Sequence, residues 1–114
     1  MHYLEVAREE AMAFLDEGQY AHVVGLFQEL AREIDPTRPE SLRVEKVEDF
    51  FELKDKGGVL GKINLRVFFI VTGRSIVVLC AIKKEADGQT PMWAKIRTRY
   101  RLRNFSLGAY GPIA

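Results

Sequence analysis

The sequence predicts an α+β fold, because helical and strand periodicities occupy separate halves of the chain. In the first half, apolar residues recur at the 3.6-residue spacing of amphipathic helices over 8–18 and 19–34. In the second half, β-branched and aromatic residues dominate three runs, 49–56, 62–72 and 75–82. The expected architecture is an N-terminal helix hairpin packed on a small antiparallel sheet, followed by a basic C-terminal helix.

Length and composition are those of one folded domain that spans residues 1–114. The chain is 47% hydrophobic and 29% charged, which are ordinary values for a globular protein. A chain of this size buries roughly two-thirds of its unfolded surface, which is enough for one core. The end of the chain, 105–114, is punctuated by glycine and proline and predicts a loosely held tail.

The N-terminal elements are expected to be a short strand and two helices. The stretch HYLEVA, 2–7, suits a strand, and Gly18 is placed to end the first helix. The stretch DPTRP, 35–39, ends the second helix, because a helix cannot continue through two closely spaced prolines. The two helices then form a hairpin that covers one face of the sheet.

Glycine-containing turns separate the three predicted strands. Gly57 and Gly58 follow the first strand, and the stretch TGRS, 72–75, joins the other two as a hairpin. These later strands are apolar at consecutive positions, which indicates burial on both faces. Together with the short N-terminal strand, they predict an antiparallel sheet built around a three-stranded meander.

The basic segment 91–104 permits two structures. Lysine or arginine at every second position from Lys95 to Arg103 suits a strand, whereas Thr90 followed by Pro91 suits the start of a helix. We favour the helix. In either structure we expect an apolar face that docks on the protein and a cationic face that stays open. In the helix, the residues of the apolar face are Met92, Trp93, Ile96 and Tyr100.

Charge is divided unevenly between the two halves, although the net charge is only +1. Residues 1–42 hold three basic and nine acidic residues, and residues 43–114 hold fourteen basic and seven acidic residues. The formal charges are therefore −6 and +7, which favours a polyanionic partner for the second half. The alternative is that the charges interleave in three dimensions and cancel.

Cysteine content and hydropathy favour a cytoplasmic protein. A single cysteine, Cys80, excludes an internal disulfide and lies in an apolar run, where it reads as a small buried side chain. The first ten residues, MHYLEVAREE, carry charged side chains from residue 5 onwards and therefore lack the apolar stretch of a signal peptide, so none is predicted. The longest apolar stretch is about seven residues, whereas a membrane span needs about 20.

Five stretches of sequence, in this order, resemble one family of small proteins. They are EEAMAFLDE before a long helix, FFELKDKGG, LRVFFIV with a turn, IVVLCAIKK, and TPMWAKIRTR after a short loop. Over roughly residues 3–104 the chain resembles the RelE superfamily of toxins from bacterial toxin–antitoxin modules, and in particular its phage-derived, HigB-like branch. The resemblance implies a metal-free endoribonuclease without a cofactor. Such an enzyme cleaves mRNA in the ribosomal A site, inhibits translation and is silenced by a partner antitoxin protein.

The basic residues of the predicted strands suit this chemistry. Attack of the RNA 2′-hydroxyl on the adjacent phosphate needs a base, cations for the transition-state charge and an acid for the leaving 5′-oxygen. Crowded lysines can act without histidine, because neighbouring positive charges lower a lysine pKa. Antiparallel pairing can bring Lys54, Arg66 and either Lys83 or Lys84 to one face of the sheet.

By resemblance, Lys54 corresponds to the family's base and Arg66 to the arginine that stabilises the phosphate. Lys84 or Lys83 corresponds to the cation that assists the leaving group. Glu52 departs from the pattern, since some relatives have a second lysine there, and Trp93 matches the base-stacking aromatic only loosely. These departures leave weakened, altered or lost cleavage as alternatives.

The remaining cations are candidate phosphate contacts, which set affinity and salt dependence but not sequence choice. Two other functions stay open: a toxin on the same scaffold with a non-RNA target such as gyrase, and a non-catalytic RNA- or protein-binding module. Together with Trp93, the candidate RNA-binding residues are Lys83, Lys95, Arg97, Arg99, Arg101 and Arg103.

Overall fold

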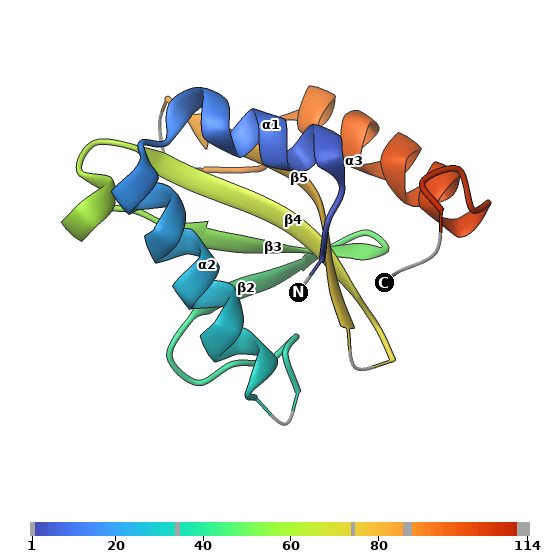
Figure 1. The fold of residues 1–114 in the computed structure, drawn as a ribbon, viewed down its shortest axis with the longest axis horizontal. Helices are drawn as coiled ribbons and strands as arrows, with labels where there is room; N and C mark the ends of the chain where they lie inside the picture. Colours follow the sequence, from blue (N-terminus) through green and yellow to red (C-terminus); the bar gives the residue numbers. More distant parts are fainter. Residues whose placement is uncertain (1, 34, 74, 86–87, 112–114) are drawn as a thin grey trace.

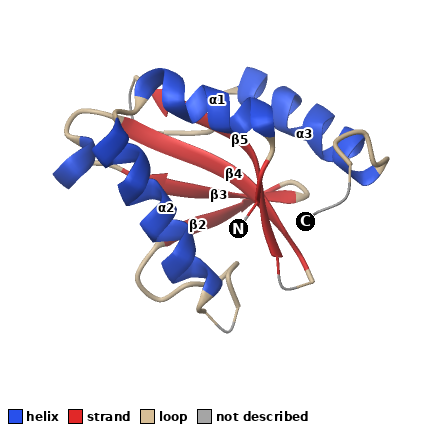
Figure 2. Cartoon of the chain, viewed as in Figure 1, coloured by secondary structure: helices blue, strands red, loops and turns tan. Residues whose placement is uncertain are grey.

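A twisted five-stranded sheet positions every other element of the molecule (Figures 1 and 2). The structure, a computed structural model, describes residues 2–33, 35–73, 75–85 and 88–111. Within these ranges three α-helices and a mixed sheet of strand order β1-β5-β4-β3-β2 confirm the α+β class. The strands are β1 (His2–Tyr3), β2 (Arg43–Val47), β3 (Phe50–Asp55), β4 (Asn64–Thr72) and β5 (Ser75–Lys84). The helices are α1 (Glu5–Phe14), α2 (Glu17–Ala31) and α3 (Met92–Ser106), with a 3₁₀ turn η1 (Gly58–Leu60).

The sheet differs from the prediction in two respects. Strands β2 to β5 form a four-stranded antiparallel meander, so the three-stranded prediction missed β2. The sequence of β2, RVEKV, is short and largely exposed at a sheet edge, and it carries little of the apolar pattern that marks a strand. In addition, β1 pairs with β5 in parallel. The sheet is therefore mixed rather than purely antiparallel.

The N-terminal helices begin earlier than predicted. The strand predicted over 2–7 ends at Tyr3, because Leu4 donates its N–H to the Val78 carbonyl and then accepts a hydrogen bond from the Arg8 N–H. In α2, Asp16 and Gln19 form a reciprocal capping box that fixes the helix start. The second helix also ends earlier than predicted, at Ala31 and not at residue 34, which itself lies outside the described residues.

The two faces of the sheet have different covers. On one face, Phe27 of α2 packs edge-on against Phe69 of β4, and α1 lies along β5 (Figure 1). Side chains alternate along a strand, so the neighbouring Phe68 points to the opposite face, where it packs edge-on against Phe50. That second face is partly covered by α3, whose Ala94 and Thr98 are buried. The part beside β2 and β3 is left open to the hollows described below.

The basic segment forms the predicted helix, but it docks through a different face. The buried residues of α3 are Ala94 and Thr98, with Leu102 and Phe105 partly buried against the core. The apolar residues expected to dock are exposed, by 62% for Met92 and 66% for Tyr100. That prediction is wrong, because α3 carries apolar residues on opposite sides and the smaller ones allow close approach to β5.

The predicted tail is shorter than expected. Phe105 and Ser106 belong to α3, and turns follow over 107–110, where Leu107 and Tyr110 are exposed. The predicted tail residues 112–114 lie outside the described residues.

Candidate functional site

The strand register brings Lys54 and Arg66 side by side. They are direct partners across the antiparallel β3–β4 pair, and their side chains share one face of the sheet. Arg66 also pairs with Ile82 of β5, so Lys84, two residues further along β5, projects to that same face. Lys83 is opposite the buried Leu65 and projects to the other face. Of the two lysines that the sequence left open, the geometry groups Lys84 with Lys54 and Arg66.

Arg66 forms the buried floor of this cluster. Its Nη1 lies 3.3 Å from Oε2 of Glu52, and the two side chains are only 2% and 1% exposed. The other carboxylate oxygen of Glu52, Oε1, accepts a hydrogen bond of 2.8 Å from the Thr90 hydroxyl. Glu52 therefore ties the β4 arginine to the segment that precedes α3. Buried charge is tolerated here because each partner supplies the opposite charge or a hydrogen bond.

Lys54 forms the outer part of the cluster. Its Nζ lies 2.8 Å from Oε2 of Glu45, which projects from β2. The lysine side chain is 12% exposed, whereas the Glu45 side chain is 59% exposed, so solvent reaches this pair from the carboxylate side. The hydrogen bond from Lys54, together with the positive charges of Lys54, Arg43 and Arg66, holds the pKa of Glu45 below its usual value despite slight desolvation.

Two shallow hollows lie over these residues. One, of about 480 Å³, is lined by Lys54, Arg66 and Gln89 together with Arg43, Glu45, Lys56 and Gly88. The Lys84 Nζ donates a 2.7 Å hydrogen bond to the Gln89 carbonyl, which brings Lys84 to the rim. The second hollow, of about 340 Å³, shares Glu45, Lys54 and Gln89 and continues to Thr90 and Lys95 at the start of α3. Counting Lys84 and the buried Glu52, the larger hollow has five basic and two acidic neighbours, so an anion is favoured there.

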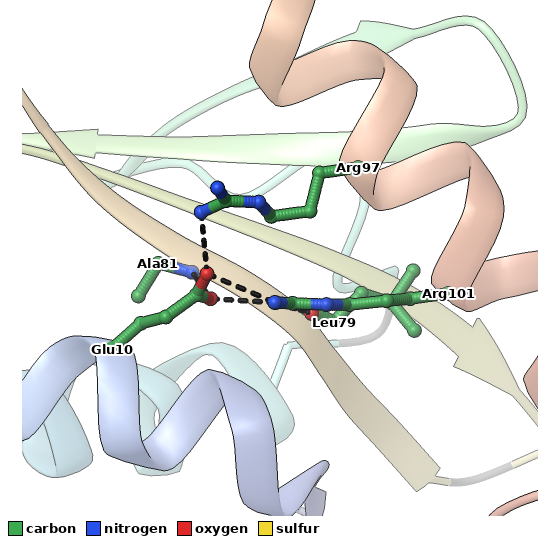
Figure 3. A network of polar contacts seen from close by, with 5 residues as sticks. All are labelled: Glu10, Leu79, Ala81, Arg97 and Arg101. Atoms are coloured by element: carbon green, nitrogen blue, oxygen red, sulfur yellow. Dashed lines mark hydrogen bonds and ion pairs between the residues drawn. The ribbon is translucent and has the colours of Figure 1, made fainter.

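Most basic residues of α3 do not face these hollows. Arg101 donates hydrogen bonds to both carboxylate oxygens of Glu10, at 2.6 Å and 3.0 Å, and to the Leu79 carbonyl at 2.9 Å (Figure 3). Arg97 donates a further hydrogen bond of 2.7 Å to Glu10. The Ala81 N–H donates to Glu10 from the same edge of β5. We call Glu10, Arg97 and Arg101 the α1–α3 clamp.

The clamp satisfies backbone groups that the sheet leaves open. Strand β1 is only two residues long, so β5 lacks a strand neighbour beyond Val78, and the β4–β5 register shifts at the same point. Glu10 and Arg101 take the place of the missing strand at Leu79 and Ala81. Burial opposes ionisation of Glu10, but hydrogen bonds from Arg101 and Ala81 and the nearby arginine charges outweigh it, so its pKa lies below the usual value.

The other candidate RNA-binding residues of α3 have separate positions. Arg99 makes a bidentate pair with Glu48 of the β2–β3 turn, at 2.7 Å and 2.9 Å. Trp93 is 50% exposed, and the Arg97 guanidinium lies 5.0 Å from the centre of its ring. Lys95 lines the second hollow, and Arg103 is exposed further along the helix. Within the described residues, Lys95 and Arg103 make no ion pair.

Sequence reasoning missed one polar pair beside the site. His22 Nε2 of α2 lies 2.9 Å from Oδ2 of Asp55, the residue after Lys54, and both side chains are about one-third exposed. No local sequence pattern predicts this contact, because its two residues lie 33 positions apart. Asp55 points away from Lys54, since strand residues alternate.

Other chemical groups in the described part of the chain carry less information. Cys80 is fully buried, and burial raises the pKa of its thiol to about 12, as expected of a packing residue rather than a nucleophile. No group of three His, Cys, Asp or Glu side chains in the described ranges is arranged as metal ligands. No described helix is long and apolar enough to cross a membrane.

Comparison with known proteins adds no assignment: no family model, no curated protein and no solved structure matches this chain.

Proposed function

We propose that the protein is an mRNA endoribonuclease, the toxin of a bacterial type II toxin–antitoxin system of the RelE-like, HigB-like kind. The observation that carries the proposal is the register of β3 and β4, which makes Lys54 and Arg66 neighbours beneath an open hollow with Lys84 at its rim. The cluster is cationic and lies under a hollow that opens to solvent, and this supports phosphate chemistry.

In the proposed reaction, the 2′-oxygen attacks the adjacent phosphorus and the bond to the 5′-oxygen breaks. Lys54 acts as the base that takes the 2′-hydroxyl proton, and Arg66 stabilises the charge on the phosphorus oxygens. Lys84 donates a proton to the leaving 5′-oxygen. The products are a 2′,3′-cyclic phosphate and a free 5′-hydroxyl, so the chemistry needs no oxidant and no external nucleophile. Lys84 is preferred to Lys83 because only Lys84 shares the face of Lys54 and Arg66.

Glu45 is the group that substrate must displace. Its carboxylate binds the Lys54 Nζ from an exposed position on β2, where incoming RNA can displace it. An exposed ion pair contributes little free energy, about 0–1 kcal/mol, so the exchange is not demanding. Glu52 is different, because it is buried and also bonded to Thr90, and it stays with Arg66 as a positioning group.

The proposed toxin function implies the partners of the protein. The substrate is mRNA bound to the ribosome in the cytoplasm, and a cognate antitoxin protein silences the toxin. Lys83, Lys95, Arg97, Arg99, Arg101 and Arg103 are the proposed RNA-binding cations. Trp93, expected from the sequence to stack on a base, is left out of this set because Arg97 already lies over its ring. Lys95 and Arg103 are the most available of them for phosphates, since Arg97, Arg99 and Arg101 already bind carboxylates of the protein. Affinity for RNA should fall steeply as salt is added.

The test is induction of the protein in growing cells, with primer extension on a reporter mRNA. Wild type is expected to arrest growth and to cut the message, and Lys54→Met/Lys84→Met should abolish both while keeping the wild-type unfolding midpoint. Lys62→Met is the matched control, because Lys62 is exposed and lines neither hollow, and it should leave cutting within about twofold of wild type. Cutting that persists in the double variant would refute the assigned site.

A second candidate, a non-catalytic binding module, is favoured by one observation. Glu52 lies against Arg66 and weakens the positive charge that a phosphorane needs. Binding to RNA without cuts, unaffected by Lys54→Met/Lys84→Met, would support this function. Growth arrest with DNA damage and intact translation would instead point to a target such as gyrase.

A further inference from the structure

The outward side of α3 carries a row of exposed apolar side chains. Met92, Ile96 and Tyr100 are spaced four residues apart and are 62%, 55% and 66% exposed, and Trp93 beside them is 50% exposed. The buried Ala94 and Thr98 lie on the other side of the helix. We call these four exposed residues the α3 stripe. Large apolar side chains gathered on a surface helix usually mark an interaction site.

Packing inside the protein does not account for the α3 stripe. The helix is already held by its buried side and by the α1–α3 clamp, in which Arg101 binds Glu10 and the Leu79 carbonyl (Figure 3). A step of two residues turns about 200° around a helix, so Met92 and Ile96 point away from the side that carries Ala94 and Thr98. The stripe therefore faces away from the sheet on a firmly anchored helix.

The α3 stripe has a polar rim that is ordered before any partner arrives. On one side, Arg97 lies over the Trp93 ring at 5.0 Å and is itself bonded to Glu10. On the other side, Arg99 is fixed by its two hydrogen bonds to Glu48. Preordered aromatic and arginine side chains are typical of residues that dominate binding energy at protein interfaces.

Charge indicates the kind of partner. Four basic residues border the stripe, namely Lys95, Arg97, Arg99 and Arg103. Only two carboxylates accompany them, Glu10 on Arg97 and Glu48 on Arg99, so positive charge is in excess along the helix. Lys95 and Arg103 supply this excess, since they make no ion pair within the described residues. We propose that the α3 stripe docks an acidic amphipathic helix of a partner protein, with apolar residues against the stripe and carboxylates towards the cations.

Three other occupants fit the surface less well. RNA bases stack on open aromatic faces, but Arg97 already lies over Trp93, and Met92 and Ile96 offer no such face. An anionic bilayer favours a uniformly cationic border, whereas this border includes Glu10 and Glu48. A second copy of the chain would bring Arg99 and Arg103 close to like charges.

Trp93 is the only tryptophan in the chain, so its fluorescence reports directly on the stripe. The probe is a synthetic helical peptide of about four turns, with leucine at i, i+3, i+4 and i+7 and glutamate elsewhere. Binding should shift Trp93 emission to shorter wavelength, because the indole leaves water. Ile96→Glu should weaken the peptide at least about tenfold, since it places a carboxylate in the apolar centre facing an acidic helix.

The matched control is Val59→Glu, which places the same charge at an isolated residue of η1 that is 58% exposed. It should bind the peptide as wild type does. Both positions are exposed, so both variants should keep the wild-type unfolding midpoint, and this is checked by urea denaturation.

Several results would overturn the proposal. Equal binding of a peptide with the same composition in scrambled order would show that charge alone acts. A Trp93 shift with phosphatidylglycerol vesicles or with poly(U), but not with the peptide, would assign the stripe to lipid or RNA. A concentration-dependent Trp93 shift without any additive, lost in Ile96→Glu, would assign it to self-association. None of these readouts uses RNA cleavage, so the result is independent of the proposed endoribonuclease activity.

Discussion

The basic residues of α3 and those of the strands differ in what they bind. Arg97 and Arg101 contact Glu10, and Arg101 also holds a backbone carbonyl of β5, so these arginines join α3 to the rest of the fold. Lys54 has a mostly exposed carboxylate as its partner, and Lys84 has a single carbonyl at the rim of a hollow. A dense run of positive charge can therefore be structural, while sparser charges on neighbouring strands remain available for chemistry.

The largest effect is expected at the buried floor of the site. Arg66→Met leaves Glu52 without its cation at a position that is 1% exposed, which should lower the free energy of unfolding by about 3–5 kcal/mol. The double variant Glu52→Leu/Arg66→Met should recover most of this loss in urea denaturation, because it removes both charges. A double variant no more stable than the single one would show that Arg66 stabilises the fold through contacts other than Glu52.

Breaking the α1–α3 clamp should have the next largest effect. Arg101→Met removes two hydrogen bonds to Glu10 and one to Leu79 from a largely buried site and should lower the free energy of unfolding by about 2–3 kcal/mol. Arg103→Met is the control, since Arg103 is exposed, and its effect should stay within about 0.5 kcal/mol. Equal effects of the two variants would contradict the structural role assigned to Arg101.

A smaller effect is expected when acid titrates the clamp. The pKa of Glu10 lies below its usual value, so its ionised form stabilises the fold at pH values above the unfolded-state pKa. That contribution should be lost progressively as the pH falls from about 5 towards the lower folded-state pKa. Unfolding free energy measured against pH should fall less steeply over this range for Glu10→Gln than for wild type. Parallel profiles would show that other carboxylates dominate acid unfolding.

The smallest effect on stability is expected at Lys54. Lys54→Met keeps most of the apolar stem and removes a pair whose partner is largely exposed, so the unfolding free energy should change by about 0.5 kcal/mol or less. The same variant should abolish cleavage if Lys54 is the base. A large loss of stability would place Lys54 with the clamp arginines as a structural residue.

Local sequence signals predicted the elements that carry the site. Runs of β-branched and aromatic residues gave β4 and β5, and Thr90-Pro91 correctly favoured a helix for α3. The expectation that Lys54 and Arg66 share one face is confirmed by their direct pairing. These features depend on alternation and on short turns, which are properties of neighbouring residues.

What could not be predicted depends on contacts between distant residues. The polar partners of the site, Glu45 and Thr90, come from an edge strand without a strong pattern and from the segment before α3. The docking side of α3 was misassigned because larger apolar residues were expected to be buried, whereas β5 accepts only small ones at close range. The parallel pairing of β1 joins residues 2–3 to residues 77–78, and periodicity does not reveal a pairing over such a separation.

The charged side chains at the borders of the sheet also bear on how the protein avoids association with itself. Beyond the two residues of β1, an uncovered β5 would present backbone groups to which a strand of another molecule could add. Glu10 and Arg101 occupy those groups at Leu79 and Ala81, while exposed charges on Arg43, Glu45 and Lys46 mark the opposite border, β2. Charged borders of this kind are a common protection against edge-to-edge aggregation. A small sheet thus has both borders protected against further strands, while the apolar side chains of the α3 stripe stay exposed.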